Sequence, residues 1–271
     1  MKKIILLFLT VIFTAKIFAS NIEYIHPFKL NPVNDGIQIG SSVALAGSAL
    51  LCDKVFNIKN SDFNSADLNK SSIPALEQMF MRPYSKGFDI TGTVVCGSIM
   101  LGPAIFAMVP NNEWTAIGVM YAESLAFAYG FKQWGKLLVS RTRPYMYFDD
   151  YPQKYVDDGD WNCSFPSGHT TLAFTGAAFT SYVFNQYFPD SKWRYAVYGI
   201  SFGAAITTGI FRMASGNHFF TDVLTGAIIG TVCGFVVPYM HTTDFYQKFE
   251  KKNKNVEVAV LPTGFSVNIK M

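Results

Sequence analysis

Long apolar segments separated by short polar ones run through most of this chain. Segments that are long and rich in Ala, Gly and Leu, and are therefore expected to be helical, cover 91–109, 114–140, 169–188, 195–211 and 219–240. An earlier apolar segment covers 39–56, and the polar stretch after it is expected to hold one short helix near 73–81. The pattern predicts an all-α bundle of about five to six core helices.

The end of the chain follows a different pattern. Apolar residues alternate with others at 256–260 and again at 267–269, with a Pro-Thr-Gly turn signal between them. This predicts a small terminal β-hairpin. The expected organisation is a leader at 1–19, a lead-in with one apolar helix at 20–86, a helical core at 87–242 and a polar tail with the hairpin at 243–271.

The first twenty residues have the layout of a bacterial secretory signal. Lys2 and Lys3 precede an apolar stretch, and small residues stand at Ala19 and Ser20. Lys16 interrupts the late part of that stretch, so a cleaved signal peptide and an uncleaved signal anchor are both open. A cleaved signal implies export.

Composition narrows the possible functions. The 271 residues are 50% hydrophobic, with a mean hydropathy of +0.20 and a formal net charge of +3. So small a charge, with no basic run interleaved with aromatic residues, argues against nucleic-acid binding. The uncharged segments 91–109 and 223–240 are long enough to span a bilayer. Glu123 lies inside 114–140, and the frequent Gly, Ser and Thr residues suit either a membrane bundle or a soluble helical core.

Loop charges predict which way a membrane bundle faces. Alternating helices place the acidic loop 149–160 on one side, and Lys192, Arg194 and the lysines of 248–254 on the other. By the positive-inside rule the acidic side faces the periplasm. A cleaved signal then requires an even number of crossings before Ser140, so 39–56 is expected not to span. An uncleaved anchor would instead supply a third crossing.

Three blocks of cationic and histidine residues stand in or beside these apolar segments, where a buried charge is costly without a partner. In the first block, Lys136 and Arg143 are seven residues apart, which places both on one face of a helix that Pro144 then ends. The two side chains can hold one anion. Snorkelling of both cations at a helix end would explain the same spacing.

The second block is Pro166-Ser167-Gly168-His169, directly before an apolar helix. Ser167 is expected to cap that helix, whose first N–H groups form an anion site. Gly168 permits close approach of a phosphate, and His169 is placed to act as a general acid. An ordinary helix start with a surface histidine is the alternative.

In the third block, His218 and Asp222 are four residues apart. On a helix the carboxylate would accept the imidazole N–H and raise the basicity of the other nitrogen, as a histidine nucleophile requires. Arg212 can stabilise charge on phosphoryl oxygens. A surface His/Asp pair is the alternative for this block taken alone.

Together the three blocks resemble the signature of the type 2 phosphatidic acid phosphatase superfamily, which includes class A acid phosphatases and vanadium haloperoxidases. The resemblance covers about residues 90 to 240. It implies an all-helical, metal-independent hydrolase without a cofactor, in which His218 forms a phosphohistidine, Asp222 orients His218 and His169 protonates the leaving group. The phosphate would be held by Lys136, Arg143, Ser167, Gly168 and Arg212.

Some residues depart from this pattern or stand outside it. Phe211 occupies a position where the family often has Ser, which removes one hydroxyl contact to phosphate. Arg141 is expected to point elsewhere, to substrate or solvent, and the acidic loop 149–160 to be solvated. The four cysteines lack metal-site spacing, and His26 and His241 receive no role.

The function expected from these residues is hydrolysis of a lipid phosphate such as phosphatidic acid, phosphatidylglycerol phosphate, polyprenyl pyrophosphate or a lipid A phosphate. The expected place is the bacterial inner membrane, with the site facing the periplasm. A soluble periplasmic acid phosphatase is the first alternative. A vanadium haloperoxidase and a non-catalytic lipid-phosphate binder are weaker ones.

Overall fold

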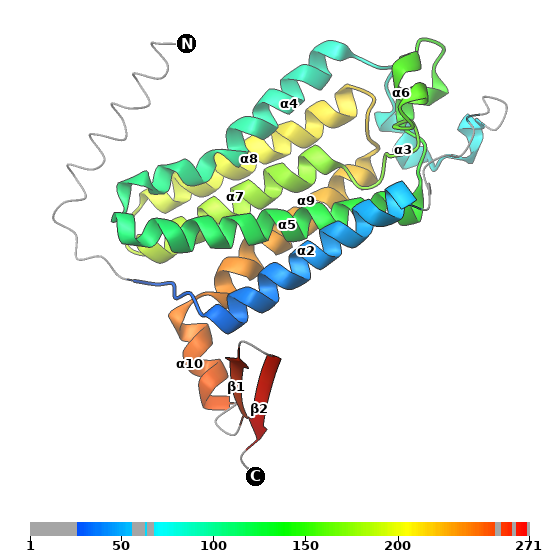
Figure 1. The fold of residues 1–271 in the computed structure, drawn as a ribbon. Helices are drawn as coiled ribbons and strands as arrows, with labels where there is room; N and C mark the ends of the chain where they lie inside the picture. Colours follow the sequence, from blue (N-terminus) through cyan, green and yellow to red (C-terminus); the bar gives the residue numbers. More distant parts are fainter. Residues whose placement is uncertain (1–25, 56–62, 64–67, 253–255, 262–263, 270–271) are drawn as a thin grey trace.

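The expected all-helical bundle is confirmed by the fold of a computed structural model, which describes residues 26–55, 63, 68–252, 256–261 and 264–269 (Figure 1). The predicted leader lies outside these residues. The long helices are α2 (Pro32–Val55), α4 (Lys86–Met100), α5 (Trp114–Val139), α7 (Gly168–Tyr187), α8 (Trp193–Ala214) and α9 (Phe220–Met240). The short ones are α3 (Ala75–Phe80), α6 (Gln153–Asp157) and α10 (Thr243–Lys252), with 3-10 turns η2 (Lys70–Ser72), η3 (Gly102–Met108), η4 (Asn111–Glu113) and η5 (Pro144–Tyr147). Strands β1 (Val256–Leu261) and β2 (Gly264–Ile269) pair antiparallel beside α10.

Helix α7 lies at the centre of the bundle and packs on α4, α5, α8 and α9 (Figure 1). Its contact with α9 is close because α9 presents glycine where the two backbones meet. A Cβ on Gly230 would lie 2.2 Å from the carbonyl oxygen of Thr171, and one on Gly234 would lie 2.5 Å from that of Thr175. Helices α7 and α9, which begin next to the second and third blocks, are therefore held against each other by backbone contact.

Helix α4 ends earlier than the apolar pattern predicts. The sequence suggests one helix over 91–109, whereas the α-helix stops at Met100 and a 3-10 turn continues it from Gly102. Pro103 explains the change, since it has no N–H to donate and its ring clashes with the carbonyl four residues earlier in an α-helix.

Helix α2 runs parallel to α5 along its length. Leu45 packs against Gly130, where a Cβ would lie 2.8 Å from the leucine Cγ, and the Ser48 hydroxyl lies 3.3 Å from Nε1 of Trp134. Because both pairs of contacts advance in the same direction, α2 and α5 end at the same side of the bundle. This direction bears on how the chain crosses a membrane.

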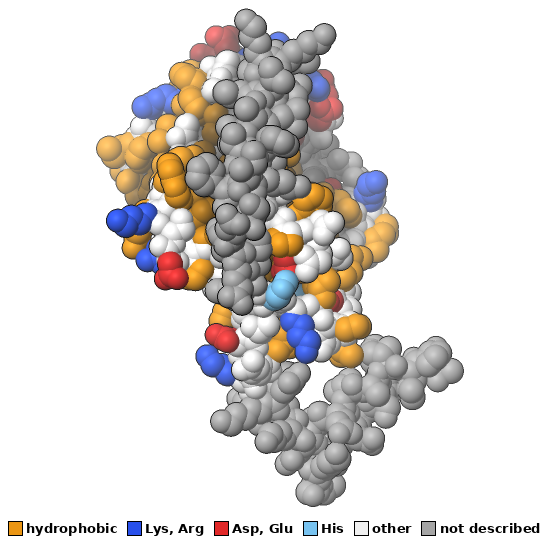
Figure 2. All heavy atoms as spheres, turned by 90° about the vertical axis from the view of Figure 1, so that its left-hand side faces the viewer, with side chains coloured by type: hydrophobic (Ala, Val, Ile, Leu, Met, Phe, Trp, Pro, Cys, Tyr) orange, Lys and Arg blue, Asp and Glu red, His pale blue; other side chains and the backbone are white. Residues whose placement is uncertain are grey.

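Three helical stretches are long and apolar enough to cross a bilayer: Pro32–Val55, Lys86–Met108 and Phe220–Met240. Large apolar side chains also point outward; Leu101, directly after α4, and Ile200 of α8, for example, are 71% and 73% exposed. Figure 2 looks onto the end of the bundle remote from α6 and shows hydrophobic side chains at the surface, with Lys and Arg set among them. These features are those of a membrane protein.

Candidate active site

The three sequence blocks meet in one cavity of about 370 Å³ at the end of the bundle where α4, α7 and α9 begin and α5 and α8 end. Six of the eight predicted site residues line it: Lys136, Arg143, Gly168, His169, Arg212 and His218. Ser167 and Asp222 are fully buried behind its wall. The lining also includes residues that the sequence analysis did not assign to the site, among them Asp89, Thr93, Lys132, Tyr155, Asp160 and Asn217.

His218 is held in a single orientation. It is 2% exposed, and its Nδ1 lies 2.7 Å from the carbonyl oxygen of Ser164. Since a carbonyl can only accept, Nδ1 carries the proton and Nε2 keeps its lone pair. Nε2 lies 3.3 Å from Nη1 of Arg143, on the wall of the cavity. This is the tautomer that a nucleophilic Nε2 requires.

The surroundings of His218 keep its imidazole neutral. Burial lowers its pKa well below the usual 6.5, and the positive charges of Arg143 and Arg212 lower it further. A neutral imidazole has the free electron pair that a nucleophile needs at neutral pH.

The predicted hydrogen bond between His218 and Asp222 is absent, and the prediction was wrong on this point. Oδ2 of Asp222 lies 3.9 Å from Nδ1 of His218 and accepts from the Ser164 hydroxyl at 2.5 Å and from the Phe219 amide at 2.9 Å. The four-residue spacing assumed a helix, but α9 begins only at Phe220. Asp222 therefore fixes the Ser164 loop, whose carbonyl in turn fixes His218.

Arg141 points neither to the cavity nor to bulk solvent, contrary to the expectation. Its Nη1 donates to Asp222 at 2.6 Å, and its Nη2 lies 3.3 Å from Glu77 of α3. Its guanidinium also stacks 4.0 Å from the centroid of the Phe219 ring. Arg141 thus compensates the buried Asp222 charge and fastens α3 to the start of α9.

Two carboxylates hold the arginines of the cavity. Asp160 accepts from Nη2 of Arg143 at 2.8 Å, although the sequence had placed this residue in a solvated loop. Asp89, at the start of α4, pairs with Nη1 of Arg212 at 2.5 Å and also accepts from the amide of Asn217 at 3.2 Å. These pairs orient the guanidinium groups before any ligand binds.

His169 lies in the first turn of α7, with its Nε2 3.2 Å from the Thr93 hydroxyl of α4. Ser167 is the N-cap residue as expected, but its hydroxyl pairs with the Thr170 hydroxyl at 2.9 Å and caps no backbone N–H. The first N–H groups of α7 have no acceptor within the helix, so they can serve an anion at Gly168.

Lys132 is the cation that sequence reasoning missed. It lies one helical turn before Lys136 on α5, and its Cδ would lie 2.9 Å from a Cβ on Gly168. The same spacing rule that joined Lys136 to Arg143 would have found it. With Lys132, four cationic side chains and two carboxylates line the cavity, which therefore favours an anion.

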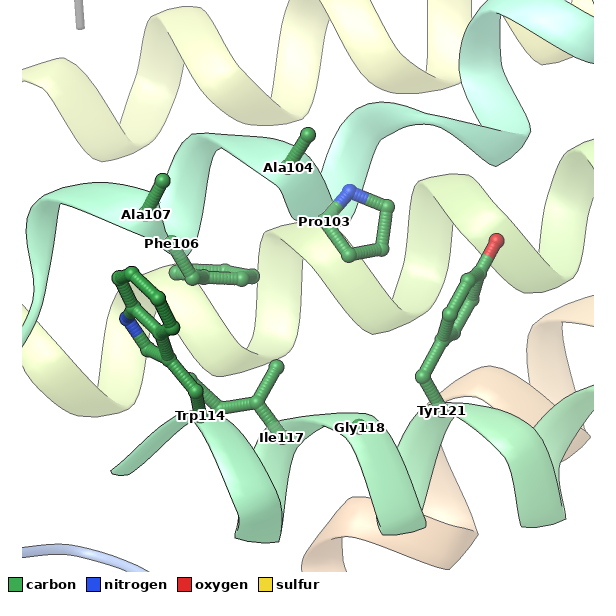
Figure 3. Close-up of a pocket in the computed structure, with 8 residues that line it drawn as sticks. All are labelled: Pro103, Ala104, Phe106, Ala107, Trp114, Ile117, Gly118 and Tyr121. Carbon is green, nitrogen blue, oxygen red and sulfur yellow. The ribbon is translucent and has the colours of Figure 1, made fainter. Parts of the chain in front are cut away.

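A second hollow, of about 350 Å³, lies between η3 and the start of α5 (Figure 3). Its lining is apolar apart from two ring groups. Nε1 of Trp114 donates to the carbonyl of Val109 at 3.1 Å, and the Tyr121 hydroxyl donates to that of Met100 at 2.6 Å. It presents no acid, base or nucleophile, so the reaction belongs to the polar cavity.

Comparisons with known proteins agree with this site. Residues 117–246, which include all eight predicted site residues, match the model of the PAP2 superfamily. Over 124 residues the chain is 32% identical to lipid A 1-phosphatase of Porphyromonas gingivalis. That match covers 46% of this chain and 24% of the relative, so the chain matches about a quarter of the relative's length.

Two solved structures are similar to the fold. The crystal structure of Aquifex aeolicus LpxE is 23% identical with a TM-score of 0.42, covering 60% of this chain and 92% of that one. The crystal structure of the first transmembrane PAP2 type phosphatidylglycerolphosphate phosphatase from Bacillus subtilis is 20% identical with a TM-score of 0.36, covering 90% and 96%.

Proposed function

We propose that this chain, which belongs to the PAP2 superfamily through residues 117–246, is a membrane phosphatase that hydrolyses a phosphomonoester or pyrophosphate of a lipid. One observation carries the proposal: a buried, neutral His218 directs Nε2 into a cationic cavity at one end of an apolar helical bundle. A nucleophile inside an anion site is the arrangement that phosphoryl transfer needs.

The reaction proceeds in two steps. Nε2 of His218 attacks phosphorus, and the bond to the leaving oxygen breaks as the phosphohistidine forms; His169 gives that oxygen a proton. A water molecule then attacks phosphorus, returns a proton to His169 and releases phosphate from Nε2. The charge on the phosphoryl oxygens is stabilised by Lys136, Arg143, Arg212 and the N–H groups at Gly168. No metal or cofactor takes part in either step.

Ser164 and Asp222 act by holding the nucleophile. The Ser164 carbonyl accepts the Nδ1 proton of His218 at 2.7 Å and stabilises the positive charge that the ring gains during attack. Asp222 holds that loop through the serine hydroxyl at 2.5 Å. Asp222 is thus a positioning residue, one step removed from the imidazole.

A lipid is the proposed substrate class. The cavity opens among helices whose outer faces are apolar, so a substrate that diffuses in the bilayer reaches it without leaving the membrane. The relative from Porphyromonas gingivalis is a lipid A 1-phosphatase, which supports a lipid phosphate of the phosphatidic acid, phosphatidylglycerol phosphate, polyprenyl pyrophosphate or lipid A type.

The site is proposed to face the periplasm, because the basic loop residues lie at the opposite end of the bundle. Helix α2 and the stretch that begins with α4 are long and apolar enough to span. With α5, which runs parallel to α2 and is proposed as a further crossing, the chain would cross three times before Ser140. This differs from the expectation that 39–56 does not span. An outward site then places the start of α2, at Pro32, on the cytoplasmic side.

The test is phosphate release by the full chain in detergent micelles, with a panel of the four lipid phosphates and soluble phosphomonoesters. We expect turnover of at least one lipid and much weaker turnover of soluble esters. Halogenation that needs added vanadate, or lipid binding without phosphate release, would overturn the proposal. Release from membranes by carbonate at high pH, with preference for soluble esters, would favour the soluble acid phosphatase instead.

A further inference from the structure

Three ionisable side chains that the proposed reaction does not use meet at the end of the bundle opposite the cavity. Asp35 comes from α2, Glu123 from α5, and His241 directly follows α9. Their exposed fractions are 8%, 2% and 0%, and one ligand atom from each lies within 4.8 Å of the others. The residues are far apart in sequence, so no spacing motif announces the cluster.

The orientation of His241 leaves one nitrogen facing the carboxylates. Its Nδ1 lies 2.9 Å from the carbonyl oxygen of Val237, so Nδ1 carries a proton, and in the neutral ring Nε2 keeps its lone pair. Nε2 lies 3.1 Å from Oδ1 of Asp35 and 3.3 Å from Oε2 of Glu123. Three atoms with lone pairs thus face one another inside the protein.

Most of these atoms lack a hydrogen bond. Within the described part of the chain, Nε2 of His241, Oδ1 of Asp35 and both carboxylate oxygens of Glu123 are buried without a hydrogen-bond partner. The same holds for both amide atoms of Gln38, which is 4% exposed and lies one turn after Asp35 on α2. Buried polar atoms without a hydrogen-bond partner are costly, so a positive charge bound among these atoms would stabilise the group.

A proton alone satisfies the cluster poorly. If an N–H on Nε2 points to Asp35, both carboxylate oxygens of Glu123 still lack a donor. Two carboxylates beside one imidazolium also leave one negative charge uncompensated. A divalent cation attracts all the oxygens and accepts the imidazole lone pair as well. The hydrogen bond from Nδ1 of His241 to a backbone carbonyl is also the outer contact that metal-bound histidines usually make.

We propose that Asp35, Glu123 and His241 bind a divalent transition-metal ion, with Zn²⁺ as the best fit. One imidazole nitrogen with two carboxylates is a donor set that suits Zn²⁺, whereas Mg²⁺ and Ca²⁺ prefer oxygen alone. The amide oxygen of Gln38 is placed on the same face of α2 to serve as a fourth donor. The ion would join α2, α5 and the end of α9.

This site is structural and separate from the reaction. Helix α9 has 21 residues, so its two ends are about 30 Å apart, and the metal-independent chemistry at His218 needs nothing from the far end. Because α2 packs mainly on α5, the ion is expected to hold α2 in the bundle. Its loss should lower thermal stability while turnover at low temperature stays within a few-fold of the native value.

The test uses the full chain, purified in detergent without a histidine tag, stripped with EDTA and then titrated with Zn²⁺ alone. We expect one tightly bound zinc per chain by calorimetry and elemental analysis, together with a rise in melting temperature. Glu123→Gln and Asp35→Asn should each abolish stoichiometric binding and the rise. Wild-type protein that binds no zinc, or that melts at the same temperature with and without it, would overturn the proposal.

His26 provides the matched control. It pairs with Glu113 at 2.5 Å near the start of α5, but its side chain is 60% exposed and the other carboxylate oxygen of Glu113 accepts from the Tyr187 hydroxyl at 2.7 Å. His26→Gln should leave zinc binding unchanged. If His26→Gln lost as much zinc as Glu123→Gln, the binding would be adventitious and the proposal would be wrong. This comparison also holds if Glu123→Gln itself folds poorly, because His26→Gln leaves the proposed ligands in place.

Discussion

The two ends of helix α9 each hold one buried histidine, and their surroundings are opposite in charge. His218 and His241 both donate Nδ1–H to a backbone carbonyl, so in each neutral ring it is Nε2 that keeps the lone pair. Nε2 of His218 faces Arg143, while Nε2 of His241 faces Asp35 and Glu123. The same side chain, anchored in the same way, is thus prepared for an anion at one end and for a cation at the other.

The largest effect is expected from replacing His218, with a replacement of His241 as the comparison. His218→Ala should lower kcat by about 10⁴-fold or more, because the covalent intermediate is proposed to form on Nε2 of His218. His241→Gln should leave kcat within a few-fold of the native value. Phosphate release measures both, with a size-exclusion profile to confirm folding. Measurable covalent turnover by His218→Ala would contradict the mechanism.

Asp222→Asn should have a smaller effect on kcat, about 10- to 100-fold, because Asp222 positions His218 only through the Ser164 loop. KM should change little, since Asp222 does not line the cavity. Ser164→Ala keeps the carbonyl that holds Nδ1 and is expected to lower kcat less than Asp222→Asn. A loss in Asp222→Asn equal to that of His218→Ala would show that the carboxylate contacts the imidazole directly.

Replacing Gly230 tests the contact that brings α7 and α9 together. Gly230→Ala should destabilise the fold by about 1–3 kcal/mol, because its Cβ would lie 2.2 Å from the Thr171 carbonyl oxygen. Gly203→Ala in α8 is the matched control, since its Cβ meets nothing within 4 Å. Thermal unfolding in detergent compares them. Equal melting temperatures would mean that the two backbones are not in contact.

The pH dependence of kcat/KM tests how the positive charges around His218 affect its protonation. His218 must be neutral to attack, and its pKa is lowered below 6.5, so activity should persist below pH 6.5 and fall only at more acidic pH. Arg143→Gln removes the strongest charge effect on His218 and should move the acid limb to higher pH. An acid limb that does not move in this variant would count against the proposed cause.

The last prediction concerns the side of the membrane that the cavity faces, and a labelling pattern tests it. In a Cys52→Ser background, the thiol introduced by Asp150→Cys on the cavity side should react with a membrane-impermeant maleimide in intact spheroplasts. The thiol introduced by Asp190→Cys, in the loop between α7 and α8, should react only after lysis. The reverse pattern would place the site in the cytoplasm.

The helical segments were largely predictable because their boundaries depend on local signals. The predicted segments 114–140, 169–188 and 219–240 differ from α5, α7 and α9 by one residue at most at either end. Pro103 is a local signal for the end of an α-helix, but the apolar pattern alone continues past it. The start of α2 at Pro32 was missed, since its first turns are polar where they meet the rest of the bundle.

The sequence by itself determined the helices and the three blocks, and therefore the anion chemistry at the cavity end of the bundle. It could do so because the site residues lie close to helix termini and follow short spacings. Only the tertiary structure decided which groups compensate the charges of these residues: Asp89 for Arg212, Asp160 for Arg143 and Arg141 for Asp222. It also brought Asp35, Glu123 and His241 together from three helices. The physical reason is that spacing along one helix sets which face a side chain occupies, whereas the charge opposite it depends on how separate helices pack.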